Sequence, residues 1–487
     1  MQMRRIFIFS AALVLAGLFT APAFAATVTL RYGSSGAAVT TLQNELISAG
    51  YLAAGNNNGN FGPLTLAAVK KFQCAKSIVC SGTSYGLAGP MTQAALQLYA
   101  IPVQPATVGG TSLTGPATGK FEFSGWVPYW NSGTSTKDAL AHLSQLTSIM
   151  PFGYTMTTDG TLVDTAHLGS EPFASLIAAA KAQKVRVVPT VMWGNGAAIQ
   201  NVLSNQASRV ALEVQIVNAV KQNNFDGIDI DFEAKQADTV NFFSVFLKEL
   251  YARMGNKFVY CTVEARQPLE DRYSPGATIP PDATQYANDY GAMNKYCDRV
   301  EIMAYDQGTI DVRLNDARSA PYAPVADPGW VSDLVTLAAQ SISKNKLIIG
   351  VPTYGYEYQV TPVASGFQYK VLWALTPRYA MSVASQLGIT PTRTSANELG
   401  FTYNANALQA VAPTDGDSTQ TQQSAPQGGV AQNLGSQVNG TQPFNYITWS
   451  DAQAIADKVA LAHKLGLRGV AVFSFGGEDP NMWGVLK

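Results

Sequence analysis

The sequence is poor in charge, histidine and metal-binding motifs. Charged residues make up 13% of its 487 residues, and the formal net charge is −1. Without an excess of positive charge there is no basic field for a phosphate backbone, so we expect no nucleic-acid partner. The three histidines (His142, His167 and His463) are scattered, and no Cys-x-x-Cys motif occurs. The sequence therefore predicts no metal site, and nothing in it implies an organic cofactor.

Long apolar runs are also scarce, and the longest lies at the start of the chain. Arg4 and Arg5 precede the apolar stretch Ile6–Phe19, and Ala23 and Ala25 are small residues suited to a cleavage site. This pattern is typical of a secretory signal peptide spanning residues 1–25. An uncleaved membrane anchor is the alternative, but the run is short for a span of about 20 residues. We therefore expect a secreted protein without stable membrane insertion after cleavage, and we also expect it to be a monomer.

Four cysteines are an even number, and export would permit disulfides. Cys74 and Cys80 are close in sequence, and we expect them to pair. Cys261 and Cys297 are farther apart and would pair if their strands are neighbours. A metal site is the competing interpretation, which the absence of a ligand motif disfavours.

Residues 27–100 contain an internal repeat. The segments Gly59–Thr65 and Gly86–Thr92 share a Gly-Pro pair and a Thr, and small and apolar residues follow each. Glycine permits a turn and proline suits a first helical turn, so each copy indicates a helix start. The module resembles the three-helix type of peptidoglycan-binding domain in the residues Leu30–Gly36, Val39, Leu42–Gln43, Gly50–Leu52, Phe61–Thr65 and Val69–Gln73. Residues 101–120, rich in Pro, Gly, Thr and Ser, are predicted to be a linker.

Residues 121–487 alternate between strand-like and helix-like patterns. The candidate strands are Phe123–Val127, Ser148–Phe152, Val185–Thr190, Gly227–Phe232, Phe258–Val263, Val300–Ala304, Lys346–Pro352 and Gly469–Phe475. The candidate helices include Pro172–Lys184, Ala207–Gln222, Ala237–Met254, Val331–Lys344 and Ser450–Leu465. Eight such strands predict an α/β fold, a (β/α)8 TIM barrel. A doubly wound open sheet is the alternative, but no glycine-rich phosphate loop follows any strand. The long connection after the seventh strand predicts an insertion subdomain at about residues 358–444.

The segment Asp226–Glu233 carries the strongest functional signal. Side chains alternate along a strand, so Asp229, Asp231 and Glu233 share one face, which we expect to line the barrel interior. Mutual repulsion and burial raise the pKa of such carboxyls, so at least one stays protonated near neutral pH. Glu233, the outermost, is the predicted general acid. A solvated strand face or a calcium site is the alternative.

The Asp226–Glu233 segment resembles the Asp-x-x-Asp-x-Asp-x-Glu motif of glycoside hydrolase family 18, the chitinase-like enzymes. Met303–Asp306 is similar to the family's Met-x-Tyr-Asp element, and Gly125–Trp130 and Gly350–Gly355 are similar to its first and seventh strands. The resemblance covers about residues 123–487.

The resemblance implies a substrate-assisted retaining mechanism on an N-acetylglucosamine polymer. Glu233 would be the acid and then the base, Asp231 would hold the acetamide N–H, and Asp229 would tune Asp231. Tyr305 would bind the acetamide oxygen. The other expected sugar contacts are Asp306, Met303, Asp226, Tyr129, Trp130 and Trp483.

The eighth strand departs from the family pattern. Many members end it with a tryptophan under the sugar, where this chain has Phe473. Trp483 would supply a stacking surface or would pack the chain terminus, with Glu478 or Asp479 near the rim. Further residues that would line the groove or simply fill the core and surface are Tyr154, Trp193, Glu264 and Arg266.

The favoured function is a wall-targeted hydrolase of chitin or peptidoglycan, and the amino-terminal module favours peptidoglycan because tethering concentrates an enzyme on its polymer. A non-catalytic, lectin-like glycan-binding protein is one alternative, and an inhibitor or structural wall protein is another. Glu at position 233, with Asp231 and Tyr305 in place, favours the enzyme.

Overall fold

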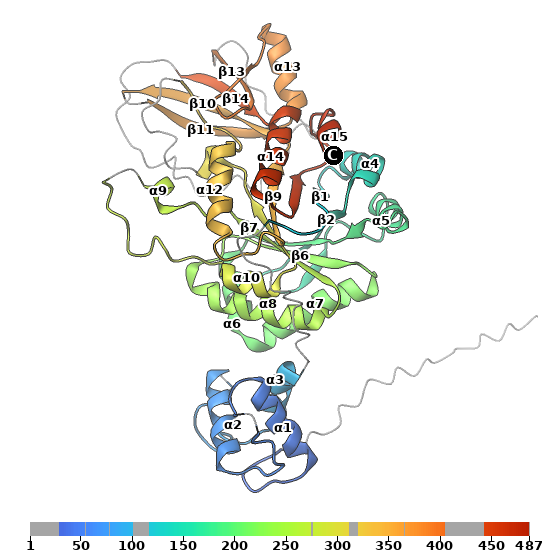
Figure 1. Cartoon of the computed structure of the whole chain (residues 1–487), viewed down its shortest axis with the longest axis vertical. Coiled ribbons are helices and arrows are strands. Elements are labelled where there is room, and N and C mark those ends of the chain that lie inside the picture. Colours follow the sequence, from blue (N-terminus) through green and yellow to red (C-terminus); the bar gives the residue numbers. More distant parts are fainter. Residues whose placement is uncertain are drawn as a thin grey trace, which may run out of the picture. The chain divides into compact units, whose positions relative to one another are not determined.

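The computed structural model describes residues 29–53, 55–76, 78–100, 116–273, 276–310, 320–364, 366–404 and 443–486. The chain divides into two compact units, residues 1–102 and 103–487 (Figure 1). The predicted signal peptide and most of the predicted linker lie outside the described residues. None of the helices in the described part is both long and apolar enough to span a bilayer.

The first unit is built from three helices, α1 (Ala37–Ser48), α2 (Pro63–Ala75) and α3 (Pro90–Ala100). Isolated bridges join Leu30 to Ala88 and Ser35 to Asn60. Its core consists of alanines, larger aliphatic residues and two phenylalanines. The core residues are Leu30, Val39, Leu42, Leu46, Leu52, Phe61, Ala68, Val69, Phe72, Ala88, Ala95 and Leu96. A disulfide joins Cys74 to Cys80.

The sequence repeat in this unit corresponds to a repeated hydrogen-bond arrangement. Buried Gln43 donates from Nε2 to the Thr65 hydroxyl at 2.9 Å, and its Oε1 accepts the N–H of the loop glycine at 2.9 Å. Buried Gln73 makes the equivalent bonds, to Thr92 at 3.0 Å and from its loop glycine at 2.7 Å. In both copies a buried glutamine therefore satisfies the polar groups of the loop that begins the next helix.

The second unit contains a closed barrel of eight parallel strands, as predicted. In order around the barrel these are β1 (Glu122–Val127), β2 (Ser148–Met156), β5 (Thr190–Trp193), β6 (Gly227–Phe232), β7 (Phe258–Glu264), β8 (Arg299–Met303), β9 (Leu347–Pro352) and β15 (Gly469–Phe473). Pairing of β1 with both β2 and β15 closes the ring. Two short strands, β3 (Leu162–Asp164) and β4 (Arg186–Val187), pair with β2.

Helices follow the strands. Those of the barrel are α4 (Ser132–Ala141), α5 (Phe173–Ala182), α6 (Gly196–Ser204), α7 (Gln206–Gln222), α8 (Val240–Met254), α9 (Leu269–Arg272), α10 (Tyr290–Tyr296), α11 (Gln307–Ile310), α12 (Pro328–Ala338), α14 (Ala452–Leu465) and α15 (Met482–Val485), with 3-10 turns at Leu143–Gln145 and Ala237–Thr239. The strand predicted at residues 185–190 is divided into β4 and β5, because Pro189 has no N–H for the ladder. Helix α12 begins before residue 331, since Asp327 caps it and Pro328 fits its first turn.

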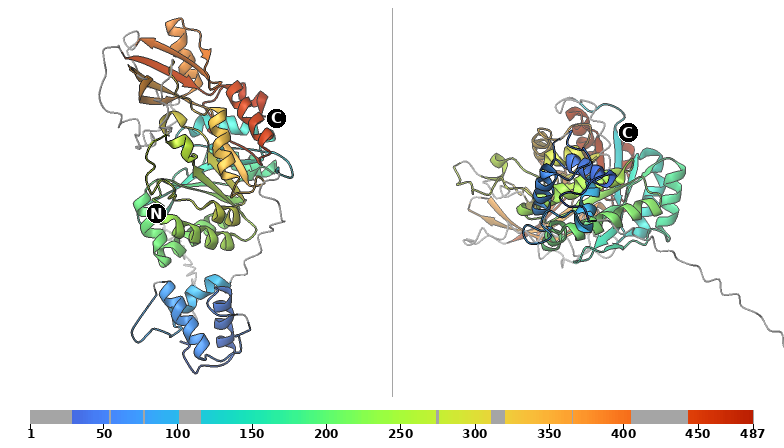
Figure 2. Two further views of the ribbon diagram at one scale, coloured as in Figure 1. Left: turned by 60° about the vertical axis from the view of Figure 1, so that its left-hand side comes forward. Right: turned by 90° about the horizontal axis from the view of Figure 1, so that it is seen from below.

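Between β9 and α14 the chain forms a separate antiparallel sheet beside the barrel (Figures 1 and 2). Its strands are β10 (Gly355–Val363), β11 (Gly366–Leu375), β12 (Thr392–Arg393), β13 (Leu399–Asn404) and β14 (Phe444–Trp449), in the order β11-β10-β14-β13-β12, with helix α13 (Pro377–Leu387). The sheet has its own small core, which includes Ile447 and Trp449.

A buried glutamate fastens this insertion to the barrel. Glu398 is fully buried and accepts hydrogen bonds from the backbone N–H groups of Val325 and Ala326, each at 2.8 Å. The ammonium of Lys458, on barrel helix α14, lies 3.9 Å from the same carboxylate. The insertion is therefore anchored by buried, charge-assisted contacts as well as by its two chain connections.

Candidate active site

Strand β6 places a line of three carboxyl groups along the barrel interior. Asp229 is fully buried, Asp231 is 2% exposed, and Glu233 follows the strand at its carboxyl end and is partly exposed. The alternate residues face the helices, and Phe232 stacks on Phe246 of α8 at 5.4 Å between ring centroids. The acidic row therefore climbs toward the end of the barrel where enzymes of this fold hold their reacting groups.

Asp229 is held by donors from three other strands. Its carboxylate accepts hydrogen bonds from Trp126 Nε1 at 3.2 Å, Thr190 Oγ1 at 2.8 Å and Thr262 Oγ1 at 2.8 Å. Burial raises the pKa of Asp229, and these three donors oppose that rise. No sequence motif identifies these three donors, although each is an interior residue of β1, β5 or β7 and Thr190 is the direct register partner of Asp229.

Asp231 and Glu233 are both shifted toward their protonated forms. Burial, followed by the charges of Glu233 and Asp229, raises the pKa of Asp231 well above its ordinary value. Asp231 Oδ1 is buried without a hydrogen-bond partner among the described residues. Burial, followed by the charge of Glu264, raises the pKa of Glu233 to about 7, although Lys235 opposes the rise. A carboxyl with such a pKa can both give and accept a proton near neutral pH.

Tyr305 lies at the carboxyl end of β8, where the neighbouring strand leaves room for its ring. A Cβ atom on Gly350 of β9 would lie 2.6 Å from Tyr305 Cε1, so only glycine accommodates the ring in this position. The ring is 5% exposed and stacks on Phe473 at 5.5 Å between centroids. Burial, with the charge of Asp306 next, raises the pKa of Tyr305, which keeps its hydroxyl protonated as a donor.

Asp306 is aimed by two tyrosines that follow strand β9. Its backbone is left-handed, with φ 63°, a conformation that residues with side chains seldom adopt. Its Oδ1 accepts hydrogen bonds from the hydroxyls of Tyr354 and, at 2.7 Å, Tyr356. Burial raises the pKa of Asp306, and the two tyrosine donors oppose this. Tyr356 belongs to β10, so the first strand of the insertion contributes directly to the site.

Aromatic rings form the rest of the barrel mouth. Phe473 ends β15, and its centroid lies 5.7 Å from that of Trp126. Tyr129 and Trp130, which follow β1, are partly exposed and 5.2 Å apart, and Trp130 packs on Phe152 of β2. Met303, at the end of β8, is also partly exposed. Phe473, Tyr129, Trp130 and Met303 thus all lie at the carboxyl ends of barrel strands.

Two tryptophans considered from the sequence are used in packing. Trp483, on α15, is 6% exposed, stacks on His142 at 4.0 Å and donates from Nε1 to Asp138 at 3.0 Å. It therefore packs the carboxyl-terminal helix against α4, which is the alternative that the sequence left open. Trp193 is 5.4 Å from Phe232 and lies with it on the helix side of the sheet.

Asp226 requires a correction. It precedes β6 and lies at the amino end of that strand, opposite Glu233. Its carboxylate accepts the N–H of Val187 at 2.8 Å, and its own N–H donates to the Val187 carbonyl at 2.9 Å. This position does not fit a contact with a sugar at the mouth, and Asp226 instead fastens β6 to β4.

Glu264, at the end of β7, lies beside the segment that follows Glu233. Its carboxylate accepts hydrogen bonds from the Ala234 N–H at 3.0 Å and from Asn288 Nδ2 at 2.9 Å. The ammonium of Lys235, a residue that no sequence motif indicates, lies 3.8 Å from the Glu264 carboxylate. Arg266 points elsewhere, and its guanidinium lies 3.8 Å from the ring centre of Tyr290.

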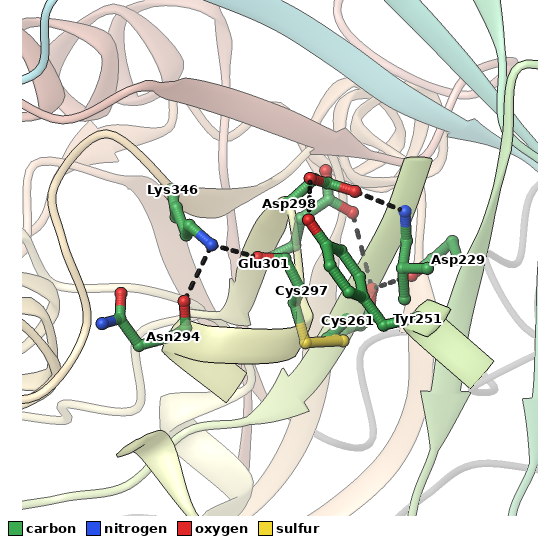
Figure 3. The surroundings of a disulfide bond; sticks show 10 residues. Asp229, Tyr251, Cys261, Asn294, Cys297, Asp298, Glu301 and Lys346 are labelled. Carbon is green, nitrogen blue, oxygen red and sulfur yellow. Dashed lines mark hydrogen bonds between the residues drawn. A yellow bond between two sulfur atoms is a disulfide. The ribbon is translucent and has the colours of Figure 1, made fainter. Parts of the chain in front are cut away.

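The second disulfide, between Cys261 and Cys297, lies behind the site (Figure 3). Cys261 is on β7 directly before Thr262, so it faces the helices while Thr262 faces Asp229. Cys297 immediately follows α10 and precedes β8, the neighbouring strand. Lys346 adds a hydrogen bond of 2.8 Å to the Cys297 carbonyl. The bridge therefore fixes the outer face of the strand that carries a donor to Asp229.

Comparisons with known proteins point in one direction. Residues 125–478 match the family described as glycosyl hydrolases family 18. Residues 35–96 match the putative peptidoglycan binding domain. In the described part of the chain, no group of three or more His, Cys, Asp or Glu side chains is arranged to hold a metal ion.

Curated relatives and solved structures share parts of the chain. The uncharacterized glycosylase YvbX of Bacillus subtilis is 25% identical over 34% of this chain and 44% of its own length. Probable chitinase 2 of Drosophila melanogaster is 26% identical over 59% of this chain and 54% of its own. The chain thus spans about half the length of these relatives. The spore cortex-lytic enzyme SleL of Bacillus megaterium has the same fold, with a TM-score of 0.54 and 21% identity over 80% of each chain.

Proposed function

The chain belongs to family 18 of the glycosyl hydrolases, and from this premise we propose that it cleaves a β-1,4-linked, N-acetylglucosamine-containing wall polymer with retention of configuration. The observation that carries the proposal is the line of three carboxyl groups formed by Asp229 and Asp231 on buried strand β6 and by Glu233 directly after it. Burial and then the charge of Glu264 raise the pKa of Glu233, the outermost of the three, to about 7, and Glu233 lies at the carboxyl end of β6.

In the first step, the acetamide oxygen of the substrate attacks the anomeric carbon of its own sugar. The bond from that carbon to the glycosidic oxygen breaks, and Glu233 gives its proton to the departing oxygen. A cyclic oxazolinium ion results, so no carboxylate of the enzyme becomes bonded to the sugar. The raised pKa of Glu233 supports this role, because a substantial fraction of the carboxyl carries its proton near neutral pH.

Asp231 and Tyr305 would hold the acetamide during this attack. The buried, unpartnered oxygen of Asp231 is available to accept the acetamide N–H, which gains positive character as the ring closes. Tyr305 would donate to the acetamide oxygen and align it with the anomeric carbon. Asp229, fixed by three donors, would keep a negative charge beneath Asp231 and so favour the protonated state of Asp231 before substrate binds.

In the second step, Glu233, now ionised, removes a proton from water as that water attacks the anomeric carbon. The bond to the acetamide oxygen breaks, the acetamide is restored, and Glu233 is protonated again. Two inversions at one carbon give net retention. Asp306 would contact the sugar with the carboxylate that Tyr354 and Tyr356 orient.

The choice of polymer rests on the first unit of the chain. A peptidoglycan-binding match at residues 35–96 supports a wall glycan as the natural substrate, because a second binding module raises the local concentration of the catalytic unit on its polymer. Chitin satisfies the same acetamide requirement, and a probable chitinase is among the relatives. We place the enzyme outside the membrane, in or at the cell wall, after removal of residues 1–25.

The test uses the protein that consists of residues 26–487. Its release of new reducing ends is measured on purified peptidoglycan and, in parallel, on chitin oligomers. Glu233→Gln keeps the shape of the side chain but removes its acid function. We expect cleavage of peptidoglycan by the wild type and loss of at least about a hundredfold in the variant, the scale of a general acid. Binding of glycan without cleavage, equal in both proteins, would reject the enzyme and leave a lectin-like protein.

A further inference from the structure

Lys235 is a buried lysine two residues beyond Glu233. Its side chain is 0% exposed, and its Nζ has no hydrogen-bond partner among the described residues. The ammonium lies 4.7 Å from the centre of the Phe243 ring on α8 and 3.8 Å from Glu264 Oε2. A buried ammonium is costly unless a compensating charge is near, so this lysine needs the carboxylate that faces it.

The carboxylate that faces Lys235 belongs to Glu264, and it is also hydrogen-bonded to the backbone beside Glu233. Its Oε1 accepts the N–H of Ala234, and its Oε2 accepts the Asn288 amide and faces Lys235. Ala234 has φ 55°, which is uncommon for a residue with a side chain and is held only where the surroundings impose it. On the other side, a Cβ on Gly196 would lie 2.0 Å from the Ala234 carbonyl oxygen, so glycine is required there. The segment after Glu233 is therefore held on two sides.

We propose that Glu264 and Lys235 form a positioning pair that fixes the Glu233 segment and sets, with opposite signs, the alkaline limit of the reaction. The proposal rests on the proposed function of Glu233 as the acid. Neither residue is required to touch the sugar, and Lys235 is too deeply buried to do so.

The charged groups around Glu233 come from four parts of the barrel. Asp231 is on the same strand, Glu264 ends β7, Asp306 follows β8, and Lys235 is in the loop after β6. Burial and then Glu264 are the main causes that raise the pKa of Glu233, Asp306 adds to the rise, and Lys235 opposes it. Of these neighbours, Glu264 and Lys235 have no assigned part in the reaction, so their charges can be removed separately from the chemistry.

The signs follow from electrostatics. A negative neighbour disfavours ionisation of Glu233, so removal of the Glu264 charge lowers the pKa of the acid. The acid then loses its proton at lower pH, and the alkaline limb of the pH–rate profile moves to lower pH. Removal of the Lys235 charge raises the pKa of Glu233 and moves that limb to higher pH. A purely structural contact would lower activity in both variants without moving the limb in opposite directions.

The experiment is the pH dependence of kcat/KM for Glu264→Gln and Lys235→Met on the polymer that the wild type cleaves. We expect shifts on the order of half to one pH unit, downward for the first and upward for the second. Asp282→Asn and Lys184→Met remove the same charges at exposed positions and should leave the limb unchanged. Lys235→Arg keeps the charge and should also leave it unchanged, which provides a second test if Lys235→Met folds poorly.

A measurement that does not need turnover separates this inference from the proposed function. With carboxyl-labelled glutamate, the NMR titration of Glu233 is assigned by its absence in Glu233→Gln. Its midpoint should move down in Glu264→Gln and up in Lys235→Met even if no polymer is cleaved. Equal midpoints in both variants and the wild type, or shifts of the same sign, would overturn the proposal.

Discussion

Replacement of Thr262 by valine tests how far the activity depends on the support of Asp229. The hydroxyl of Thr262 donates to Asp229 Oδ1 at 2.8 Å, and the acceptor is fully buried. Valine has nearly the same shape but places a methyl group where the donor stands. Asp229 Oδ1 then loses this donor, while Trp126 and Thr190 still serve Oδ2.

The magnitude follows from the charge of the acceptor. A hydrogen bond to a charged group contributes about 1.5–3 kcal/mol, against about 1 kcal/mol for a neutral pair. Loss of that amount from the anionic form of Asp229 raises its pKa further, because the Thr262 donor is one of the groups that oppose the effect of burial. Asp229 then competes with Asp231 for a proton, and the charge beneath Asp231 is weakened. If the whole effect reaches the transition state, kcat/KM falls by about ten- to a hundredfold.

Stability should change much less than activity. A buried Asp229 can take up a proton rather than remain an unsupported anion, so the free energy of unfolding should fall by only about 1 kcal/mol. Thr448→Val is the matched control, because its hydroxyl lies 3.3 Å from buried Glu398 within the insertion. We expect that variant to lose comparable stability and to keep its kcat/KM.

The assays are denaturant unfolding and kcat/KM for reducing-end release, measured on both variants at the same pH. A Thr262→Val protein that keeps kcat/KM to within about twofold of the wild type would refute the role given to Asp229. Equal activity losses in both threonine variants would instead point to general loosening of the fold.

Two other predictions test different parts of the structure. Gly350→Ala should cost about 1–3 kcal/mol of stability and most of the activity, because the new Cβ would lie 2.6 Å from the Tyr305 ring. The control is Gly133→Ala, which has open space around the new Cβ and should be nearly neutral in unfolding and turnover assays. Burial alone would raise the pKa of Glu122, but the hydrogen bonds and charge of Arg299 hold that pKa below 4.5. The ionised Glu122 therefore stabilises the fold at pH values above its unfolded-state pKa, and this stabilisation is lost as pH falls below about 4.5. Unfolding of Glu122→Gln across pH should therefore show a deficit at neutral pH that shrinks in acid, and a constant deficit would contradict the linkage.

The barrel could be predicted because its signals are local. Most of the strands are short, largely apolar runs, and Gly227–Phe232 is β6 with the predicted ends. The alternation of acids also singled out β6 as the strand that we propose carries the catalytic groups, because a parallel strand covered on both faces is normally apolar throughout. Where local chemistry interrupts a run, as at Pro189, the predicted single strand was wrong and the chain forms two.

The supporting contacts could not be predicted, because they depend on which strands are neighbours and on their register. Trp126, Thr190 and Thr262 lie up to 136 residues apart in sequence, and only the pairing of β5, β6 and β7 brings two of them beside Asp229. Lys235 lies in the loop after β6, and no local pattern in the sequence indicates that its side chain is buried. Asp226, which begins the motif, was expected to contact the sugar, although its place before the strand puts it at the opposite end.

The hydrogen bond from Tyr356 to Asp306 limits which part of the chain could be deleted without loss of the site. An insertion that enters and leaves the barrel at one connection looks like an accessory that protein engineers could excise and replace by a short loop. Excision from Gly355 to Trp449 would remove Tyr356 and leave half-buried Asp306 with the Tyr354 hydroxyl alone. It would also remove Glu398, the buried partner of Lys458. A minimal catalytic unit of this protein must therefore include the insertion, whereas residues 29–100 belong to a separate compact unit with its own hydrophobic core.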